Sequence, residues 1–248
     1  MKSDPESCPV RRLFSWLFSL EPMEKCESDP FKKLINSSRT TVRCRFNAST
    51  RLKRLSSYSF FTTTFLSLGL IFIPLVQNSD VQLHFMPKVL NMMQIFLAVA
   101  VIVYSVVNGT ARYDIRSIQL NECGDKLKDL IRNLREEQKN NSSAIENLKE
   151  YHEKYNDILS ESENHTRLDF LMTSLEMVDD YKITGLFKVL YHVKVFFWYA
   201  IPFILPSIMM FSEILFILDM LAITNVTPCY LGGDPNPKPN LVCTLCTQ

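Results

Sequence analysis

The sequence predicts an all-α membrane protein with an N-terminus-in transmembrane hairpin, cytoplasmic helices and a third candidate membrane helix. Two uncharged apolar runs of 19 residues each, Tyr58–Val76 and Val89–Val107, predict the hairpin. At 1.5 Å per residue each helix is about 28 Å long, close to the hydrocarbon thickness of a bilayer. Neither run alternates as a barrel strand would, so helices are the remaining way to cross lipid. A mean hydropathy of only +0.02 requires a polar lobe beside them.

Residues 1–38 form an N-terminal extension. Arg11–Leu20 combines two arginines with apolar residues, which predicts a short amphipathic helix on the membrane or on the protein. This stretch is too short, and ends too soon at Glu21, to be a removable targeting signal. Residues 21–38 carry mixed charge and are interpreted as a linker.

Residues 39–110 contain a basic flank and the hairpin. Six basic residues precede the first run without an acidic neighbour, namely Arg39, Arg43, Arg45, Arg51, Lys53 and Arg54. Basic residues stay on the cytoplasmic side, so the amino terminus is predicted inside, the loop Gln77–Lys88 outside, and the chain back inside near Asn108. The net charge of +1 argues against general nucleic-acid binding, and the basic flank is interpreted as a topology determinant that also touches anionic lipid.

Residues 111–185 are predicted to form a cytoplasmic helical lobe. Apolar residues recur at helical spacing in three stretches separated by Asn140–Ser143 and Ser160–Thr166. The three stripes are Cys123, Leu127, Leu130, Ile131 and Leu134; then Ile145, Leu148, Tyr151, Tyr155, Ile158 and Leu159; then Leu168, Leu171, Leu175 and Val178. Ser142 or Ser143 is suited to cap the second helix. The stripes either pack a modest core together or face neighbouring subunits.

Residues 186–223 hold the third apolar segment. Fourteen Val, Ile, Leu or Phe residues in Val195–Leu218 favour insertion by about 4 to 8 kcal/mol, against roughly 3 kcal/mol for Glu213. The sum favours a span, and a re-entrant or interfacial helix is the alternative. Glu213 is either a functional intramembrane carboxylate or, as the sequence position favours, a residue near the far interface.

The tail, residues 224–248, contains Cys243 and Cys246 in a CxxC arrangement. Without a second ligand pair this is a weak metal motif. If the third segment spans the membrane, the tail is outside the cell, where a disulfide between the two is plausible. Cys44 and Cys123 are expected to be reduced and cytoplasmic.

One face of the second run is polar or small throughout. Asn91, Gln94, Ala98, Ser105 and Gly109 follow each other at near-helical spacing. Small and polar residues in lipid usually mark helix–helix contacts, and they also suit the lining of a water-filled pore. The sequence leaves both interpretations open.

Motifs around the hairpin resemble the SLATT domain, a two-transmembrane effector domain found beside nucleotidyltransferase and nucleotide-sensor genes in bacterial conflict systems. The resemblance rests on Cys44-Arg-Phe-Asn-Ala-Ser-Thr-Arg-Leu52 before the first run, on Tyr155-Asn-Asp-Ile-Leu159, and on Glu163-Asn-His165 with Asp169-Phe170. It covers about residues 35–185, and Phe170 stands where a tyrosine is expected. The motif residues are Asn47, Arg51, Asn164, His165 and Asp169.

The resemblance implies a membrane effector of a bacterial anti-phage system, located in the inner membrane. It implies a homo-oligomer that forms a pore or perturbs the bilayer, as in abortive infection, when a co-encoded partner such as a reverse transcriptase or nucleotidyltransferase senses infection. Direct nucleic-acid binding is not expected. The alternative is a membrane-anchored scaffold whose cytoplasmic helices recruit a partner.

The motif residues also have structural interpretations. Asn47 and Arg51 share one helix face, where they can bond lipid phosphate or, preferably, a neighbouring helix. His165 beside Asn164 and Asp169 suggests acid–base chemistry or a metal, but a single histidine is a poor metal site. Asn164 is therefore expected to cap a helix, with His165 bonding backbone or Asp169. No catalytic set, metal site or cofactor is predicted.

Overall fold

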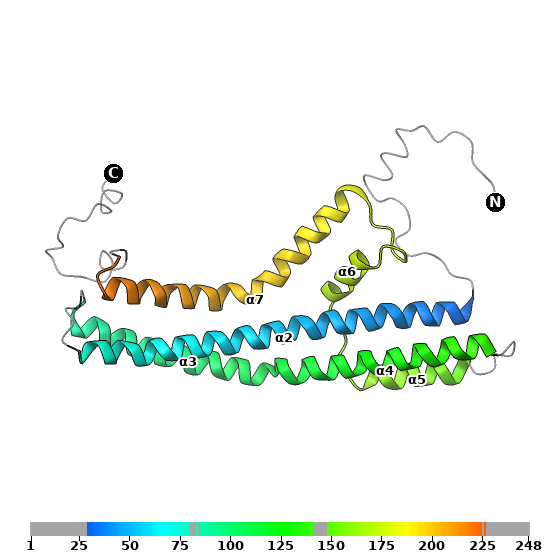
Figure 1. Cartoon of the computed structure of the whole chain (residues 1–248), viewed down its shortest axis with the longest axis horizontal. Coiled ribbons are helices and arrows are strands. Elements are labelled where there is room, and N and C mark those ends of the chain that lie inside the picture. Colours follow the sequence, from blue (N-terminus) through cyan, green and yellow to red (C-terminus); the bar gives the residue numbers. More distant parts are fainter. Residues whose placement is uncertain (1–28, 80–82, 84, 141–147, 225, 227–248) are drawn as a thin grey trace. The chain divides into compact units, whose positions relative to one another are not determined.

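The computed structural model describes residues 29–79, 83, 85–140, 148–224 and 226, and these contain helices and no β-strand (Figure 1). The helices are α2 (Pro30–Gln77), α3 (Pro87–Ala111), α4 (Tyr113–Asn140), α5 (Leu148–Ser160), α6 (Arg167–Glu176) and α7 (Gly185–Met220). The all-α prediction is confirmed. The predicted helix at 11–20, the cap at 142–143 and the cysteine pair at 243 and 246 lie outside the described residues.

α2 begins earlier than the sequence suggested. Residues 30–38 were interpreted as the end of a linker, which is wrong, because they form the first turns of α2. The Asp29 carboxylate accepts a hydrogen bond from the Phe31 backbone N–H at 3.0 Å and so caps the helix. Phe31, Leu34 and Ile35 are buried, and this apolar face is what holds the segment helical.

The chain divides into two compact units, at Arg54–Leu55, Arg112–Tyr113 and Ile201–Pro202. These points differ from the compositional boundaries at 38, 110 and 185. α2 continues through the first point without a break, so no change in composition indicates the boundary between the units there. The second coincides with Arg112, whose left-handed backbone (φ 48°, ψ 40°) ends α3 and separates it from α4.

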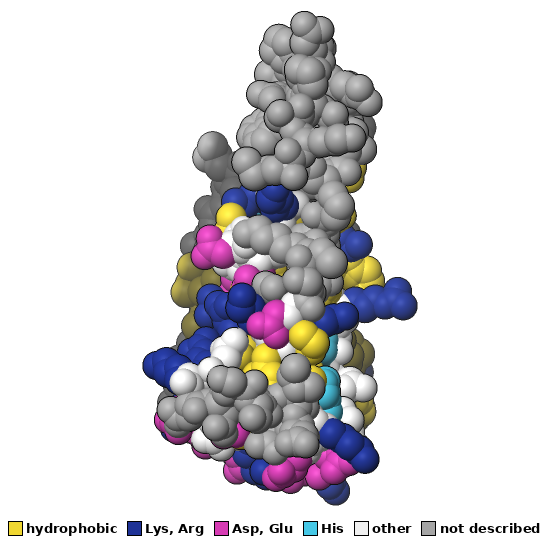
Figure 2. Space-filling model, turned by 90° about the vertical axis from the view of Figure 1, so that its right-hand side faces the viewer, with side chains coloured by type: hydrophobic (Ala, Val, Ile, Leu, Met, Phe, Trp, Pro, Cys, Tyr) yellow, Lys and Arg dark blue, Asp and Glu magenta, His cyan; other side chains and the backbone are white. Residues whose placement is uncertain are grey.

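The lobe, meaning the described residues up to Arg54 together with Tyr113–Ile201, has a core shared by α2, α4 and α5. Buried α4 residues pack against the start of α2, and partly buried α5 residues cover them; the cluster includes Leu34, Val42, Leu127, Leu134, Tyr155 and Ile158. The predicted stripes of α4 and α5 therefore face one another rather than neighbouring subunits. Figure 2 shows Lys and Arg side chains beside Asp and Glu on the lobe surface, as expected of a face in water.

The membrane unit, meaning Leu55–Arg112 with the residues from Pro202 onward, is apolar outside as well as inside. α2, α3 and α7 are each long and apolar enough to cross a bilayer, so the third candidate span joins the hairpin. Its core includes Leu66, Ile73, Leu97 and Met220, with Phe85 stacked on Phe216 at 5.1 Å between ring centroids. The exposed surface includes Phe60, Ile95, Ile102 and Phe211. An apolar surface of this extent suits contact with lipid or with other membrane helices.

Candidate functional site

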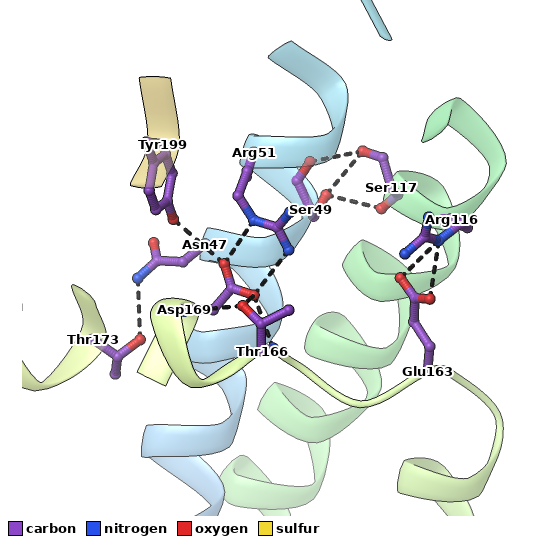
Figure 3. Close-up of polar contacts among 10 residues, drawn as sticks. All are labelled: Asn47, Ser49, Arg51, Arg116, Ser117, Glu163, Thr166, Asp169, Thr173 and Tyr199. Atoms are coloured by element: carbon purple, nitrogen blue, oxygen red, sulfur yellow. Dashed lines mark hydrogen bonds and ion pairs between the residues drawn. The ribbon is translucent and has the colours of Figure 1, made fainter. Parts of the chain in front are cut away.

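The two sequence motifs meet in the lobe, immediately before the first apolar run (Figure 3). Arg51 on α2 donates from Nε to Asp169 Oδ1 and from Nη2 to Asp169 Oδ2, both at 3.0 Å. The Asp169 carboxylate is fully buried and the Arg51 side chain is 23% exposed. This bidentate pair joins residues 118 positions apart in sequence and fixes α6 to α2.

Asp169 also caps its own helix. Its carboxylate accepts hydrogen bonds from the Thr166 backbone N–H at 3.0 Å and hydroxyl at 2.7 Å, and from the Tyr199 hydroxyl at 3.4 Å. The Thr166 hydroxyl in turn accepts from the Asp169 N–H, which completes a capping box. Burial alone would raise the pKa of Asp169, but the bonds from Arg51 and Thr166 outweigh it, so the pKa is lowered.

Thr166, and not Asn164, is the cap of α6, so the prediction for Asn164 is wrong. Asn164 lies two residues before the cap, where its Oδ1 accepts a hydrogen bond from Arg45 Nη2 at 3.4 Å. The carboxylate of the preceding Glu163 pairs with Arg116 on α4, with 2.9 Å between Glu163 Oε2 and Arg116 Nε. The segment between α5 and α6 is therefore held to α2 and to α4.

Arg45 is the least expected member of the site. It is fully buried, and its Nε and Nη1 atoms have no hydrogen-bond partner among the described residues. The sequence counted Arg45 in a basic flank touching lipid, which is wrong for this residue. Arg39, Arg43 and Arg51 also pair with carboxylates of the lobe, at 3.7, 3.3 and 3.0 Å. Helical spacing in this stretch, which puts Arg45 on the buried face, was the available signal.

His165 is half-buried, and its Nδ1 atom has no hydrogen-bond partner among the described residues. Nδ1 therefore does not make the bond to backbone or to Asp169 that was expected of His165. Burial and then the charge of Arg45 lower the pKa of His165 below its ordinary value of 6.5. Burial likewise raises the pKa of the Cys44 thiol, so Cys44 is held as an unreactive thiol.

Asn47 extends the same contact toward the end of α6. Its Nδ2 atom donates to Thr173 Oγ1 at 3.1 Å and to Glu176 Oε2 at 3.3 Å. Asn47 and Arg51, one helical turn apart, thus bond a neighbouring helix rather than lipid phosphate. Two serines that sequence analysis did not single out join α2 to α4: Ser49 Oγ donates to the Ser117 carbonyl at 2.8 Å, and Ser117 Oγ donates to the Ser49 carbonyl at 3.0 Å.

The polar face of α3 belongs to the membrane unit and has two parts. Near the loop, Gln94 Nε2 donates to Gln77 Oε1 at 2.8 Å and Gln77 Nε2 donates to Asn91 Oδ1 at 3.4 Å, which closes the hairpin. Further along, Ala98 is half-buried and Ser105 is exposed. The predicted packing or pore-lining role of this face stays a prediction.

Glu213 packs on α2 inside the membrane unit, and its predicted place near the membrane interface stays a prediction. It is fully buried against Gly69, which lies eight residues before the end of α2, about 12 Å along the helix axis. The small residues Ser67 and Gly69 in Ser67-Leu68-Gly69-Leu70 gave a signal of close helix approach.

The motif cluster is suited to holding helices together. Among the described residues no group of three or more His, Cys, Asp or Glu side chains is arranged to hold a metal ion. The Asp169 carboxylate accepts hydrogen bonds from four donor groups, and the Cys44 thiol is buried. The cluster fixes the segment between α5 and α6 to the part of α2 that precedes the first apolar run.

Comparison with known proteins agrees with this architecture. The model of the SMODS and SLOG-associating 2TM effector domain family 5 matches residues 27–212. No curated protein and no solved structure matches the chain. The match includes both motifs, the hairpin and most of α7, beyond the 35–185 that the motifs alone suggested. The chain therefore belongs to the SMODS and SLOG-associating 2TM effector domain family 5.

Proposed function

We propose that this protein oligomerises in the bacterial inner membrane and opens a pore there when a co-encoded partner activates it. Family membership implies a membrane effector in conflict systems. Three helices long and apolar enough to cross a bilayer support the membrane location. The pore, the oligomer and a partner such as a reverse transcriptase or nucleotidyltransferase are the proposal.

The exposed polar part of α3 carries the proposal. Ser105 is exposed, and Gly109 has no other atom within 4 Å of the position where a Cβ would lie. Both lie on the face of Ala98, and the other exposed α3 residues from Met92 to Val107 are Met, Ile, Phe and Val. Contacts among the described residues leave Ser105 and Gly109 uncovered, and small or polar faces in lipid are covered by other helices or line water.

The test replaces Ser105 with leucine and compares it with Val107→Leu on the same helix. The two positions are about 200° apart around α3, so only Ser105→Leu blocks the polar face. We expect Ser105→Leu to keep its membrane level but to lose toxicity and dye leakage on triggering or overproduction. Val107→Leu should retain both. Asn91 and Gln94 are poorer targets because they also close the hairpin.

A pore is contradicted if Ser105→Leu and Ala98→Leu are as toxic and as leaky as the parent. Crosslinking of Ser105→Cys between chains provides a separate measure of oligomer formation. A monomer under activating conditions would contradict the oligomer.

A partner-recruiting scaffold is the second candidate, and a groove in the lobe favours it. The groove has a volume of about 670 Å³ and is lined by basic residues of α2 and α4, including Arg43 and Arg132, and by the acidic residues Glu176 and Asp180. A mixed-charge groove suits a protein partner. If a foreign apolar hairpin replaces residues 58–107 without loss of toxicity, the spans serve only as an anchor.

A further inference from the structure

Glu213 has no partner for its carboxylate. The side chain is fully buried in the membrane unit, and neither Oε1 nor Oε2 has a hydrogen-bond partner among the described residues. The apolar runs of α2 and α3 contain no charged residue. An ionised carboxylate without a cation or hydrogen-bond donor costs several kcal/mol in such surroundings, and the protonated acid costs much less.

Gly69 provides the space in which the carboxyl group lies. A Cβ at Gly69 would be 1.6 Å from Glu213 Oε1 and 2.5 Å from Cδ. Any other residue at this position would displace the carboxyl group. The pair therefore forms a fitted contact between α2 and α7 and is not an incidental exposure of glutamate to lipid.

A groove leads from the surface of the membrane unit to this carboxyl group. Its volume is about 430 Å³, and apart from Glu213 it is lined by apolar residues and Gly69, with Leu68, Ile71 and Leu75 exposed at its edge. Because the groove lining is apolar apart from Glu213, a lipophilic molecule would enter it more readily than a hydrated ion.

The titratable groups of the surrounding helices do not compensate for a charge on Glu213. α2 contributes none between Phe65 and Ile73. Tyr104 is the titratable residue in the apolar run of α3, and its hydroxyl donates to Ser59. Asp219 on α7 accepts hydrogen bonds from Thr224 and from the Val226 N–H, and an acid cannot supply the positive charge that an ionised Glu213 would need.

From this geometry we propose that the membrane unit binds a proton at Glu213, and that the bound proton stabilises the packing of α7 on Gly69. Loss of the proton leaves a charge that this packing cannot hold, so α7 must separate from Gly69 and admit water. Acid then favours the packed arrangement and alkali the separated one. The link between separation and leakage rests on the function proposed above; the proton-binding site does not.

The first experiment labels the full-length protein in liposomes with dicyclohexylcarbodiimide. The protonated carboxyl adds across one C=N bond: its oxygen bonds to the central carbon, its proton moves to nitrogen, and an acyl shift to nitrogen gives a stable N-acylurea without a leaving group. We expect this adduct at Glu213 by peptide mass spectrometry, and no adduct in Glu213→Gln. A water-soluble carbodiimide should not label the site. Absence of the lipophilic adduct at acid pH, or labelling by the soluble reagent, overturns the proposal.

The second experiment measures dye leakage against pH. Leakage by the parent should rise from acid to alkaline pH, and Glu213→Gln, which resembles the protonated acid, should lose this rise. Ser212→Ala, one residue away and exposed, is the control and should keep it. An unchanged pH dependence in Glu213→Gln overturns the coupling. If neither protein leaks at any pH, the pore proposal fails while the labelling result still decides the proton site.

A pair of glycine variants tests the fitted contact. Gly69→Ala must displace the carboxyl group, whereas Gly109→Ala meets no atom within 4 Å. We expect Gly69→Ala to lose the Glu213 adduct or to expose Glu213 to the soluble reagent, and Gly109→Ala to match the parent. Unchanged labelling in a folded Gly69→Ala would contradict the contact.

Discussion

Arg51 and Asp169 show how much one buried ion pair organises in this protein. Asp169 joins three elements through one carboxylate: Arg51 on α2, Thr166 at the start of its own helix, and Tyr199 on α7. The oxygens are buried, so removing the carboxylate charge leaves Arg51 without its partner in a place where water replaces it poorly. The burial of Arg45 beside it adds a positive charge that Asn164 alone contacts among the described residues.

Asp169→Asn should destabilise the lobe by about 3 kcal/mol, because one partner of a largely buried pair is lost. Thermal unfolding of the purified protein in detergent, followed by circular dichroism, measures the loss. The matched control is Glu163→Gln, which removes the acid of the Arg116 pair, whose side chains are each 38% exposed. It should cost less than about 1 kcal/mol. Equal effects of the two variants would contradict the structural role of Asp169.

His165 makes the stability of the lobe sensitive to pH. Its lowered pKa means that the folded protein takes up this proton less readily than the unfolded chain. The contribution to stability is complete above about pH 6.5 and is lost as the pH falls toward the lowered pKa. Between about pH 7.5 and about pH 5.5 the melting temperature should therefore drop, and His165→Gln should drop less.

His152→Gln is the control for that measurement, because His152 is exposed on α5. It should follow the parent across the whole range. If the melting temperature of His165→Gln falls with pH as steeply as that of the parent, another group causes the pH dependence.

At the scale of the elements, long apolar runs and helical stripes predicted most of what the structure contains. α4 and α5 appear where Leu127, Leu134, Tyr155 and Ile158 repeat at helical spacing, because burying that face pays for ordering the chain. The early start of α2 was not predicted, since Lys32 and Lys33 made residues 30–38 read as a linker although every third or fourth residue is apolar. Pattern was more informative there than composition.

The site was harder to predict than the helices. Sequence spacing placed Asn47 and Arg51 on one face, but their partners are more than a hundred residues away, and no local pattern indicates which carboxylate they meet. The sequence pattern Thr166-x-x-Asp169 already indicated the capping box. The nearby Asn164 was chosen as the cap instead. The contact of Glu213 with Gly69 depends on how α7 packs against α2, and no local pattern indicates which residues of two helices meet.

Thr166→Ala should weaken the start of α6 by about 1 kcal/mol, because the N-cap hydroxyl bonds both to the Asp169 N–H and to its carboxylate. Hydrogen exchange of the first-turn amides of α6 should accelerate. Ser160→Ala is the control, because its hydroxyl bonds only the Asp157 carbonyl at the end of α5. Combined with Asp169→Asn, the loss should be less than the sum, since the two changes remove a shared bond.

At the scale of the whole molecule, topology is the most direct property to test. With all seven cysteines replaced, Ser79→Cys in the loop should react with an impermeant thiol reagent in intact cells. Glu153→Cys, exposed on α5 in the lobe, should react only after the membrane is opened. The basic flanks of the spans predict this orientation. Reaction of Glu153→Cys alone, or of both in intact cells, would contradict an inside amino terminus.

α2 belongs to both compact units, and it passes from Arg54 to Leu55 without a break. Arg51, which holds Asp169, and Gly69, which receives Glu213, are 18 residues apart, and about 3.6 residues per turn makes this five whole turns. Each unit therefore requires its own register along one helix: within the lobe Arg51 must meet Asp169, and within the membrane unit Gly69 must meet Glu213.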